Sequence, residues 1–212
     1  YVKGVLETEI NSATDNPLIF PNGGDVISGG NFHGQPLALA LDFLAIAVSE
    51  LGNISERRTE RMVNPSLNGE LPPFLTRNGG LNSGLMLLQY AAASLVSENK
   101  VLAHPASVDS IPTSGNQEDH VSMGSIAAHK VRTVVENVSW VIAAEMLAAS
   151  RGMEFISHKV GQGTGTAYQL IRERVPFKDA DQILYEELNQ VYDLLLSGLI
   201  TKKVEEAVGG EL

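Results

Sequence analysis

The feature that most constrains the fold is an unbroken helical periodicity from Leu37 to Val63. Apolar residues recur along it at helical spacing, as Leu37, Leu41, Leu44, Val48 and Leu51. Asn64-Pro65 ends the run, because the residue before a proline avoids the helical conformation. A helix of this length spans on the order of 40 Å. Its first half is apolar on nearly every side, so we expect it to be buried among several neighbours.

Shorter periodic segments flank this helix. The first residues read as the end of a helix, with Val2, Val5, Leu6 and Ile10 near one face. Further helices are expected at about Leu85–Ala103, Ser122–Arg151, Thr166–Val175 and Ala180–Ser197. The expected caps and stops are Asn82 or Ser83 and Pro105 for the first of these, a left-handed Gly152 for the second, and Asp179 for the last.

One segment has a different pattern. Leu18-Ile19-Phe20 and Val26-Ile27 flank Asn22-Gly23-Gly24, which indicates a short hairpin. The chain is therefore predicted to be all-α, an elongated bundle of long helices with one small β-hairpin. We expect residues 1–212 to form a single helical domain.

Composition excludes several classes of protein. The net charge of −10 argues against a nucleic-acid surface, which needs clustered lysine and arginine. Asp42 and Glu50 interrupt the most apolar run, Leu37 to Leu51, so no membrane span is expected. Cysteine is absent, which removes disulfides and thiolate chemistry and fits a reducing, cytoplasmic compartment.

Two irregular segments are dense in polar residues and lie beside the ends of apolar helices. One combines residues 11–17 with residues 29–36, and the other covers residues 109–123. Polar loops held by a rigid scaffold are a common place for chemistry. We therefore expect any functional site to lie in these segments.

Five stretches carry a resemblance to a known family, in matching order and at matching intervals. They are residues 11–18, 30–36, 56–75, 84–110 and 113–123. The chain resembles the aromatic amino acid lyases, and within them the histidine ammonia-lyases, strongly over residues 1–151. The last sixty or so residues match by helical character alone.

The resemblance implies a homotetramer whose active sites draw on more than one subunit, and L-histidine as the substrate that is converted to urocanate and ammonia. It also implies a methylidene-imidazolone electrophile, formed from an internal Ala-Ser-Gly, and no metal. That tripeptide does not occur in this sequence. In the family it lies in an N-terminal domain, so this chain would be the C-terminal part of a lyase and inactive alone.

Three residues match positions that face the active site in the family. Glu118 is expected to be catalytic, holding the substrate near the electrophile and helping to manage its protons. It is expected just before a helix start, where the helix dipole stabilises a carboxylate, so a capping role is the alternative. A glutamate here fits histidine lyases, whereas phenylalanine and tyrosine lyases usually carry glutamine.

Phe32 and Asn16 are the expected substrate-binding residues. Phe32 would form an apolar wall against the substrate side chain, and ordinary core packing is its alternative. Asn16 would bond the substrate carboxylate, although Asp-Asn-Pro is also a common turn sequence. The five histidines show no metal-ligand spacing, and the glycines of residues 161–165 are expected to form a helix connection rather than a nucleotide loop.

Two other interpretations stay open. One is a tyrosine or phenylalanine ammonia-lyase or an aminomutase of the same family. The other is a non-catalytic helical oligomerisation module, which would explain the apolar helices but not the dense polar loops.

Overall fold

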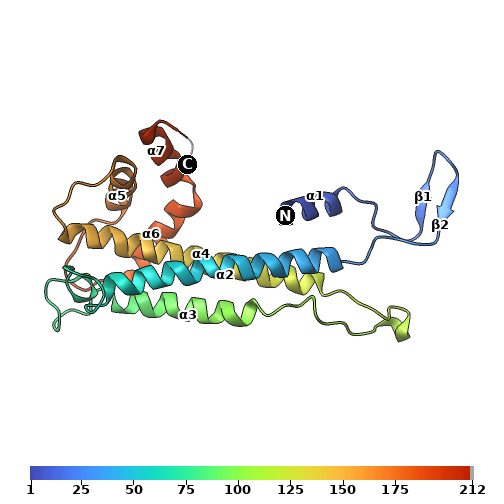
Figure 1. The fold of residues 1–212 in the computed structure, drawn as a ribbon, viewed down its shortest axis with the longest axis horizontal. Coiled ribbons are helices and arrows are strands. Elements are labelled where there is room, and N and C mark those ends of the chain that lie inside the picture. Colours follow the sequence, from blue (N-terminus) through green and yellow to red (C-terminus); the bar gives the residue numbers. More distant parts are fainter. Residues whose placement is uncertain (211–212) are drawn as a thin grey trace. The chain divides into compact units, whose positions relative to one another are not determined.

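The structure, a computed structural model, describes residues 1–210. Within these residues the regular secondary structure is helical except for one two-stranded sheet, which confirms the predicted all-α class with a small hairpin (Figure 1). The helices are α1 (Val2–Ile10), α2 (Gln35–Val63), α3 (Met86–Leu102), α4 (Gly124–Gly152), α5 (Gln162–Arg174), α6 (Leu184–Leu196) and α7 (Leu199–Val208).

The hairpin joins β1 (Leu18–Phe20) to β2 (Asp25–Ile27) in antiparallel register, with Leu18 opposite Ile27. Gly24 adopts a positive φ of 74° in the turn, and its N–H bonds the Phe20 carbonyl at 2.9 Å. A residue without Cβ adopts this conformation at little cost, which explains the glycine at position 24.

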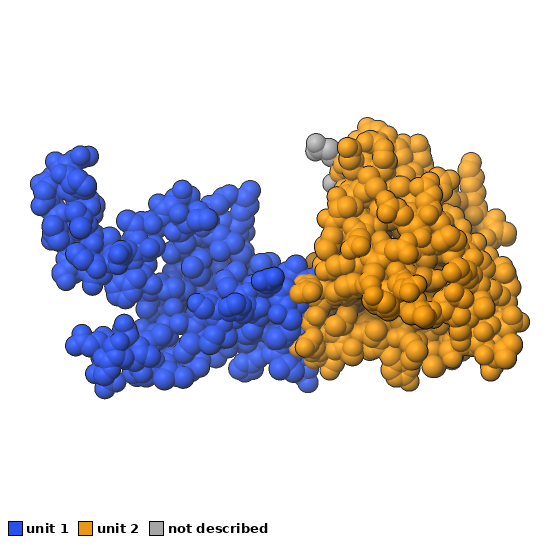
Figure 2. All heavy atoms as spheres, turned by 180° about the vertical axis from the view of Figure 1, so that it is seen from behind, with its two compact units in different colours: residues 1–49, 99–135 blue, residues 50–98, 136–212 orange. Residues whose placement is uncertain are grey.

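The chain divides into two compact units (Figure 2). Unit 1 comprises residues 1–49 and 99–135, and unit 2 comprises residues 50–98 and 136–212. The prediction of one helical domain over residues 1–212 stays a prediction.

Unit 2 contains the larger apolar core. Trp140 stacks on Tyr192 with ring centroids 3.6 Å apart, and α5, α6 and α7 pack against one another. Each fully buried leucine or valine side chain stabilises the fold by roughly 1.5–3 kcal/mol relative to an exposed one. The buried core includes Val63, Leu75, Leu85, Leu88, Val141, Leu147, Ile171, Val175, Val191 and Leu194.

Two helix boundaries in unit 2 differ from the sequence prediction. Gly152 is right-handed helical, with φ −59° and ψ −35°, because α4 continues into a 3-10 turn at Met153–Phe155. Asp179 does not cap α6, which begins at Leu184; its carboxylate instead accepts the distant Arg77 N–H at 3.1 Å.

The C-terminal helices also depart from expectation. α5 begins at Gln162, so most of residues 161–165 lie in the helix rather than in a connection. A Cβ at Gly163 would lie 3.2 Å from Val204, so glycine allows α5 to approach α7. α7 itself was not predicted; it follows Gly198, whose left-handed φ of 68° separates it from α6.

Unit 1 has a small core built on alanines. Ala38, Ala106 and Ala127 are buried together, with Leu41 and Met123 packed against them. α2 is long and apolar enough to cross a membrane by length and composition, which the interrupted run of its sequence did not lead us to expect. Core helices meet the same criterion, and the buried Asp42, ion-paired with Lys130 at 3.3 Å, is typical of a helix packed inside protein.

Candidate active site

An open pocket of about 280 Å³ lies in unit 1 between two segments that are far apart in the sequence. The segment that precedes α2 contributes Phe32 and His33. The segment between α3 and α4 contributes the remaining lining residues, Thr113, Glu118, His120, Val121 and Ser122. Phe32 and Glu118, predicted separately as wall and catalytic acid, therefore face the same cavity.

Glu118 is held by a tight turn. Its N–H and carbonyl pair with the carbonyl and N–H of Thr113, at 3.4 and 3.0 Å. Ser114, Gly115 and Asn116 between them all have positive φ, at 51°, 62° and 71°. Left-handed conformations at non-glycine residues cost on the order of 1–3 kcal/mol each and gather at functional sites. The turn thus fixes where the carboxylate of Glu118 points.

The carboxylate of Glu118 is stabilised by hydroxyl groups. Thr113 Oγ1 donates a hydrogen bond to Glu118 Oε2, and this bond, followed by that of the Ser114 hydroxyl, lowers the pKa of Glu118. The expectation that Glu118 lies just before a helix start is wrong, since α4 begins only at Gly124. Neighbouring hydroxyls, and not a helix dipole, favour the charged form.

Phe32 is 62% exposed, so it is not a core residue of this chain, contrary to the alternative reading of its role. Gly30 sets its position, because a Cβ there would lie 2.6 Å from the Asp15 carbonyl oxygen and 2.9 Å from the Phe32 ring. Asn31 ties the same stretch to the preceding loop by donating to the Ala13 carbonyl at 3.4 Å.

His33 and His120 connect the two sides of the pocket. Their rings stack with centroids 5.0 Å apart and planes at 13°. His33 Nε2 donates to the His120 carbonyl at 3.0 Å. Over residues 1–210, no group of three or more histidine, aspartate or glutamate side chains is arranged to hold a metal ion.

Asn16 is exposed, and its N–H bonds the Asp15 carboxylate at 2.8 Å. Among the described residues that line the pocket, Asn16 does not occur. The structure thus brings together Phe32 and Glu118 but not Asn16. Thr113, Gly30 and His33 were missed by sequence reasoning, because only the fold brings each of them to its partner.

Comparison with known proteins identifies what this chain resembles. Residues 1–173 match the aromatic amino acid lyase family. Histidine ammonia-lyase of Caldanaerobacter subterraneus subsp. tengcongensis is 62% identical over 207 residues, which cover 97% of this chain and 41% of that protein.

Two solved structures are also similar. The crystal structure of histidine ammonia-lyase from Trypanosoma cruzi has a TM-score of 0.93 at 51% identity, covering 97% of this chain and 41% of that one. Tyrosine aminomutase from Streptomyces globisporus has a TM-score of 0.91 at 36% identity, covering 97% of this chain and 39% of that one. The chain thus spans about 41% of the length of the curated relative and of the Trypanosoma enzyme.

Proposed function

The chain belongs to the aromatic amino acid lyase family, and we propose that it forms the C-terminal part of a histidine ammonia-lyase, which converts L-histidine to urocanate and ammonia. One observation carries the proposal: an ionised carboxylate and an exposed ring, Glu118 and Phe32, line one open pocket. That pair suits a substrate that carries both a positively charged amine and an aromatic side chain.

The reaction poses two chemical problems. The amine is a poor leaving group, and the β-proton is weakly acidic. The methylidene-imidazolone group, when bound, supplies an electrophile that turns the amine into a better leaving group. The lining of this pocket fits such a group arriving from elsewhere, because it offers a carboxylate, two hydroxyls and two imidazoles but no electrophile of its own. The sequence also lacks the Ala-Ser-Gly that forms the group, so the chain alone turns over no histidine.

Glu118 is the catalytic residue of this proposal. The hydroxyls of Thr113 and Ser114 lower its pKa and so favour the charged form, which accepts a hydrogen bond from the imidazole or the amine of the substrate. It thereby orients the substrate and helps to move its protons, a contribution of typically ~10²–10⁴-fold for a positioned acid or base.

Phe32 and Asn16 complete the proposed substrate site. The Phe32 ring packs against the imidazole, and its exposure in this chain leaves it free to do so. Asn16, which does not line the pocket described above, is proposed to bind the substrate carboxylate beyond its edge.

The proposed enzyme is a cytoplasmic homotetramer. In unit 1, Leu39, Phe43 and Ile46 follow helical spacing along α2 and are 52%, 57% and 48% exposed. An exposed apolar stripe of this kind favours association with other chains. The absence of cysteine is compatible with a reducing compartment.

An aminomutase of the same family is the second candidate, favoured by the likeness to the Streptomyces enzyme. The deciding experiment uses the full-length lyase, meaning the protein of the relatives' length that contains this segment. Incubated with L-histidine, it should produce urocanate and ammonia, followed by urocanate absorbance. A β-amino acid product, or turnover of tyrosine in preference to histidine, would refute the assignment.

A further inference from the structure

We propose that Gln35 and Asp42 of α2 are positioning residues that clamp Ser107 and thereby fix Glu118 opposite Phe32. The inference deepens the proposed function and rests on it for its catalytic consequence. Its structural part concerns residues of unit 1 alone.

The clamp holds both peptide groups of Ser107. Asp42 Oδ2 accepts the Ser107 N–H at 2.7 Å, and Gln35 Nε2 donates to the Ser107 carbonyl at 2.9 Å. Gln35 and Asp42 are two turns apart on α2 and therefore lie on the same face. Two bonds in opposite directions fix the rotation of this backbone as well as its distance from the helix.

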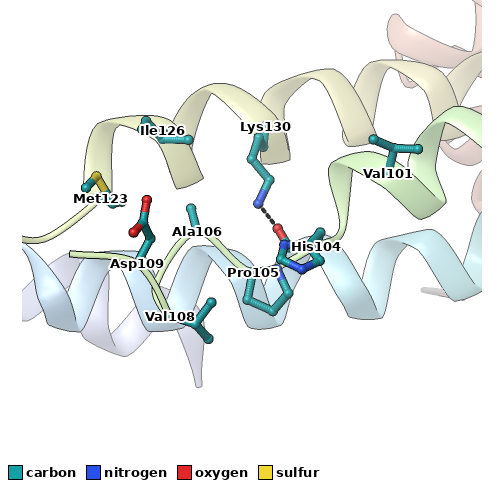
Figure 3. Close-up of a pocket in the computed structure, with 9 residues that line it drawn as sticks. All are labelled: Val101, His104, Pro105, Ala106, Val108, Asp109, Met123, Ile126 and Lys130. Carbon is teal, nitrogen blue, oxygen red and sulfur yellow. Dashed lines mark hydrogen bonds between the residues drawn. The ribbon is translucent and has the colours of Figure 1, made fainter. Parts of the chain in front are cut away.

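A buried ion pair secures the clamp. Lys130 of α4 contacts Asp42 Oδ1 at 3.3 Å. Its ammonium also donates to the His104 carbonyl, and Figure 3 shows this second bond. The side chains of Lys130 and Asp42 are only 16% and 4% exposed. With one oxygen on Lys130 and the other on Ser107, Asp42 joins α2 to α4 and to the corner that follows α3.

From Ser107, cross-bonds lead to Glu118 in two steps. Ser110 Oγ accepts the Val121 N–H at 2.9 Å, which ties the two limbs of the segment together. Thr113 then pairs with Glu118 through backbone and side chain. Ser107, Ser110 and Thr113 recur at every third residue along one limb. We therefore expect a displacement of Ser107 to move Ser110 and Thr113, and with Thr113 the carboxylate of Glu118.

The same helix also carries the opposite wall of the pocket. Gln35 is the first residue of α2, and Phe32 precedes it by less than one helical turn. The clamp thus holds Glu118 at a fixed position relative to the first turn of α2, which directly follows Phe32. Misplacing a substrate-positioning group by about 1 Å can cost on the order of 10²-fold in rate. A fixed position of Glu118 relative to Phe32 therefore favours catalysis.

The test compares two double variants of the full-length lyase. Asp42→Asn with Lys130→Met removes both charges but keeps an acceptor for Ser107. Asp42→Leu with Lys130→Met removes the charges and the acceptor. Because neither variant leaves a buried charge without its partner, their difference reports on the Ser107 bond. Gln35→Met, which removes only the bond to the Ser107 carbonyl, is the third variant and serves if the second pair does not fold.

The first readout is amide hydrogen exchange of residues 108–122, which requires no turnover. Exchange should be about tenfold faster in the Leu-Met pair than in the Asn-Met pair, and faster in Gln35→Met than in the parent. Equal exchange in clamped and unclamped proteins would overturn the inference.

The second readout is a double-mutant cycle with Glu118→Gln, because an effect exerted through Glu118 must vanish when its carboxylate is absent. With Glu118 present, the variant with Asp42→Leu and Lys130→Met should have a kcat/KM on the order of 10- to 100-fold below that of the variant with Asp42→Asn and Lys130→Met. With Glu118→Gln, the two variants should have nearly equal kcat/KM values. Equal losses in both backgrounds would show a general structural role and overturn the inference. If exchange responds as expected but no protein converts histidine, the proposed function fails while the clamp stands.

Discussion

Thr113 and Glu118 bond each other both through their backbones and through their side chains. The Thr113 hydroxyl donates to the Glu118 carboxylate at 2.5 Å, while the peptide groups of the two residues form an antiparallel bridge. The backbone bridge sets the place of the carboxylate, and the hydroxyl lowers its pKa. These two functions can be separated by substitution.

Replacing Thr113 by valine should change the pH dependence of the reaction. The hydroxyl lowers the pKa of Glu118, so its carboxylate stays ionised further into the acid range than an ordinary glutamate. Without that bond the pKa rises, and activity should be lost at a higher pH as the solution is acidified. The measurement is the acid limb of kcat/KM against pH in the full-length lyase.

Thr113→Ser is the matched control, since it keeps the hydroxyl and should leave the acid limb near its original position. An acid limb that does not move in Thr113→Val would mean that Glu118 does not govern it.

Replacing Glu118 by glutamine should leave the fold intact and reduce kcat by ~10²–10⁴-fold, the usual contribution of a positioned acid or base. The side chain is exposed in this chain, so the midpoint of thermal unfolding should change little. The rate is measured from urocanate formation at saturating histidine. Near-parental turnover would reduce Glu118 to a structural residue of the turn.

Much of the fold follows from local sequence signals. Periodicity and the Asn64-Pro65 stop place the long helix close to its observed bounds, and the Gly-Gly turn locates the hairpin. The prediction is wrong where a residue that is typical of a helix cap bonds a residue far away in the sequence instead. Asp179 is of the residue type that caps helices, but its carboxylate accepts a hydrogen bond from the backbone N–H of Arg77, in another part of unit 2.

The site shows the same limit. Phe32 and Glu118 were found because their surrounding motifs resemble a family, and the structure adds that they share a pocket. Asp42 was read only as a charge that interrupts an apolar run. Its partners Ser107 and Lys130 are remote in the sequence, and no periodicity links them. Local sequence patterns therefore do not identify residues that act by positioning a partner far away in the sequence.

Phe32 should contribute to substrate binding and little to the stability of this chain. Because it is 62% exposed, Phe32→Ala should lower the free energy of unfolding of the isolated chain by less than about 0.5 kcal/mol. Leu147→Ala is the comparison, since Leu147 is 1% exposed and a buried leucine costs about 2–5 kcal/mol when truncated.

In the full-length lyase, Phe32→Ala should raise the KM for histidine. Denaturant unfolding of the chain and steady-state kinetics of the lyase provide the two measurements. A loss of stability that matches Leu147→Ala would make Phe32 a core residue, against its observed exposure.

Gly30 should be intolerant of a single methyl group although it lies outside regular structure. A Cβ at this position would lie 2.6 Å from the Asp15 carbonyl oxygen and 2.9 Å from the Phe32 ring. The backbone oxygen cannot move without shifting its loop, so Gly30→Ala should displace Phe32 and lower kcat/KM for histidine by on the order of tenfold or more. Gly29→Ala is an adjacent control, because a Cβ at Gly29 would meet nothing within 4 Å. Equal activity of the two variants would show that the close approach at Gly30 does not determine where the Phe32 ring lies.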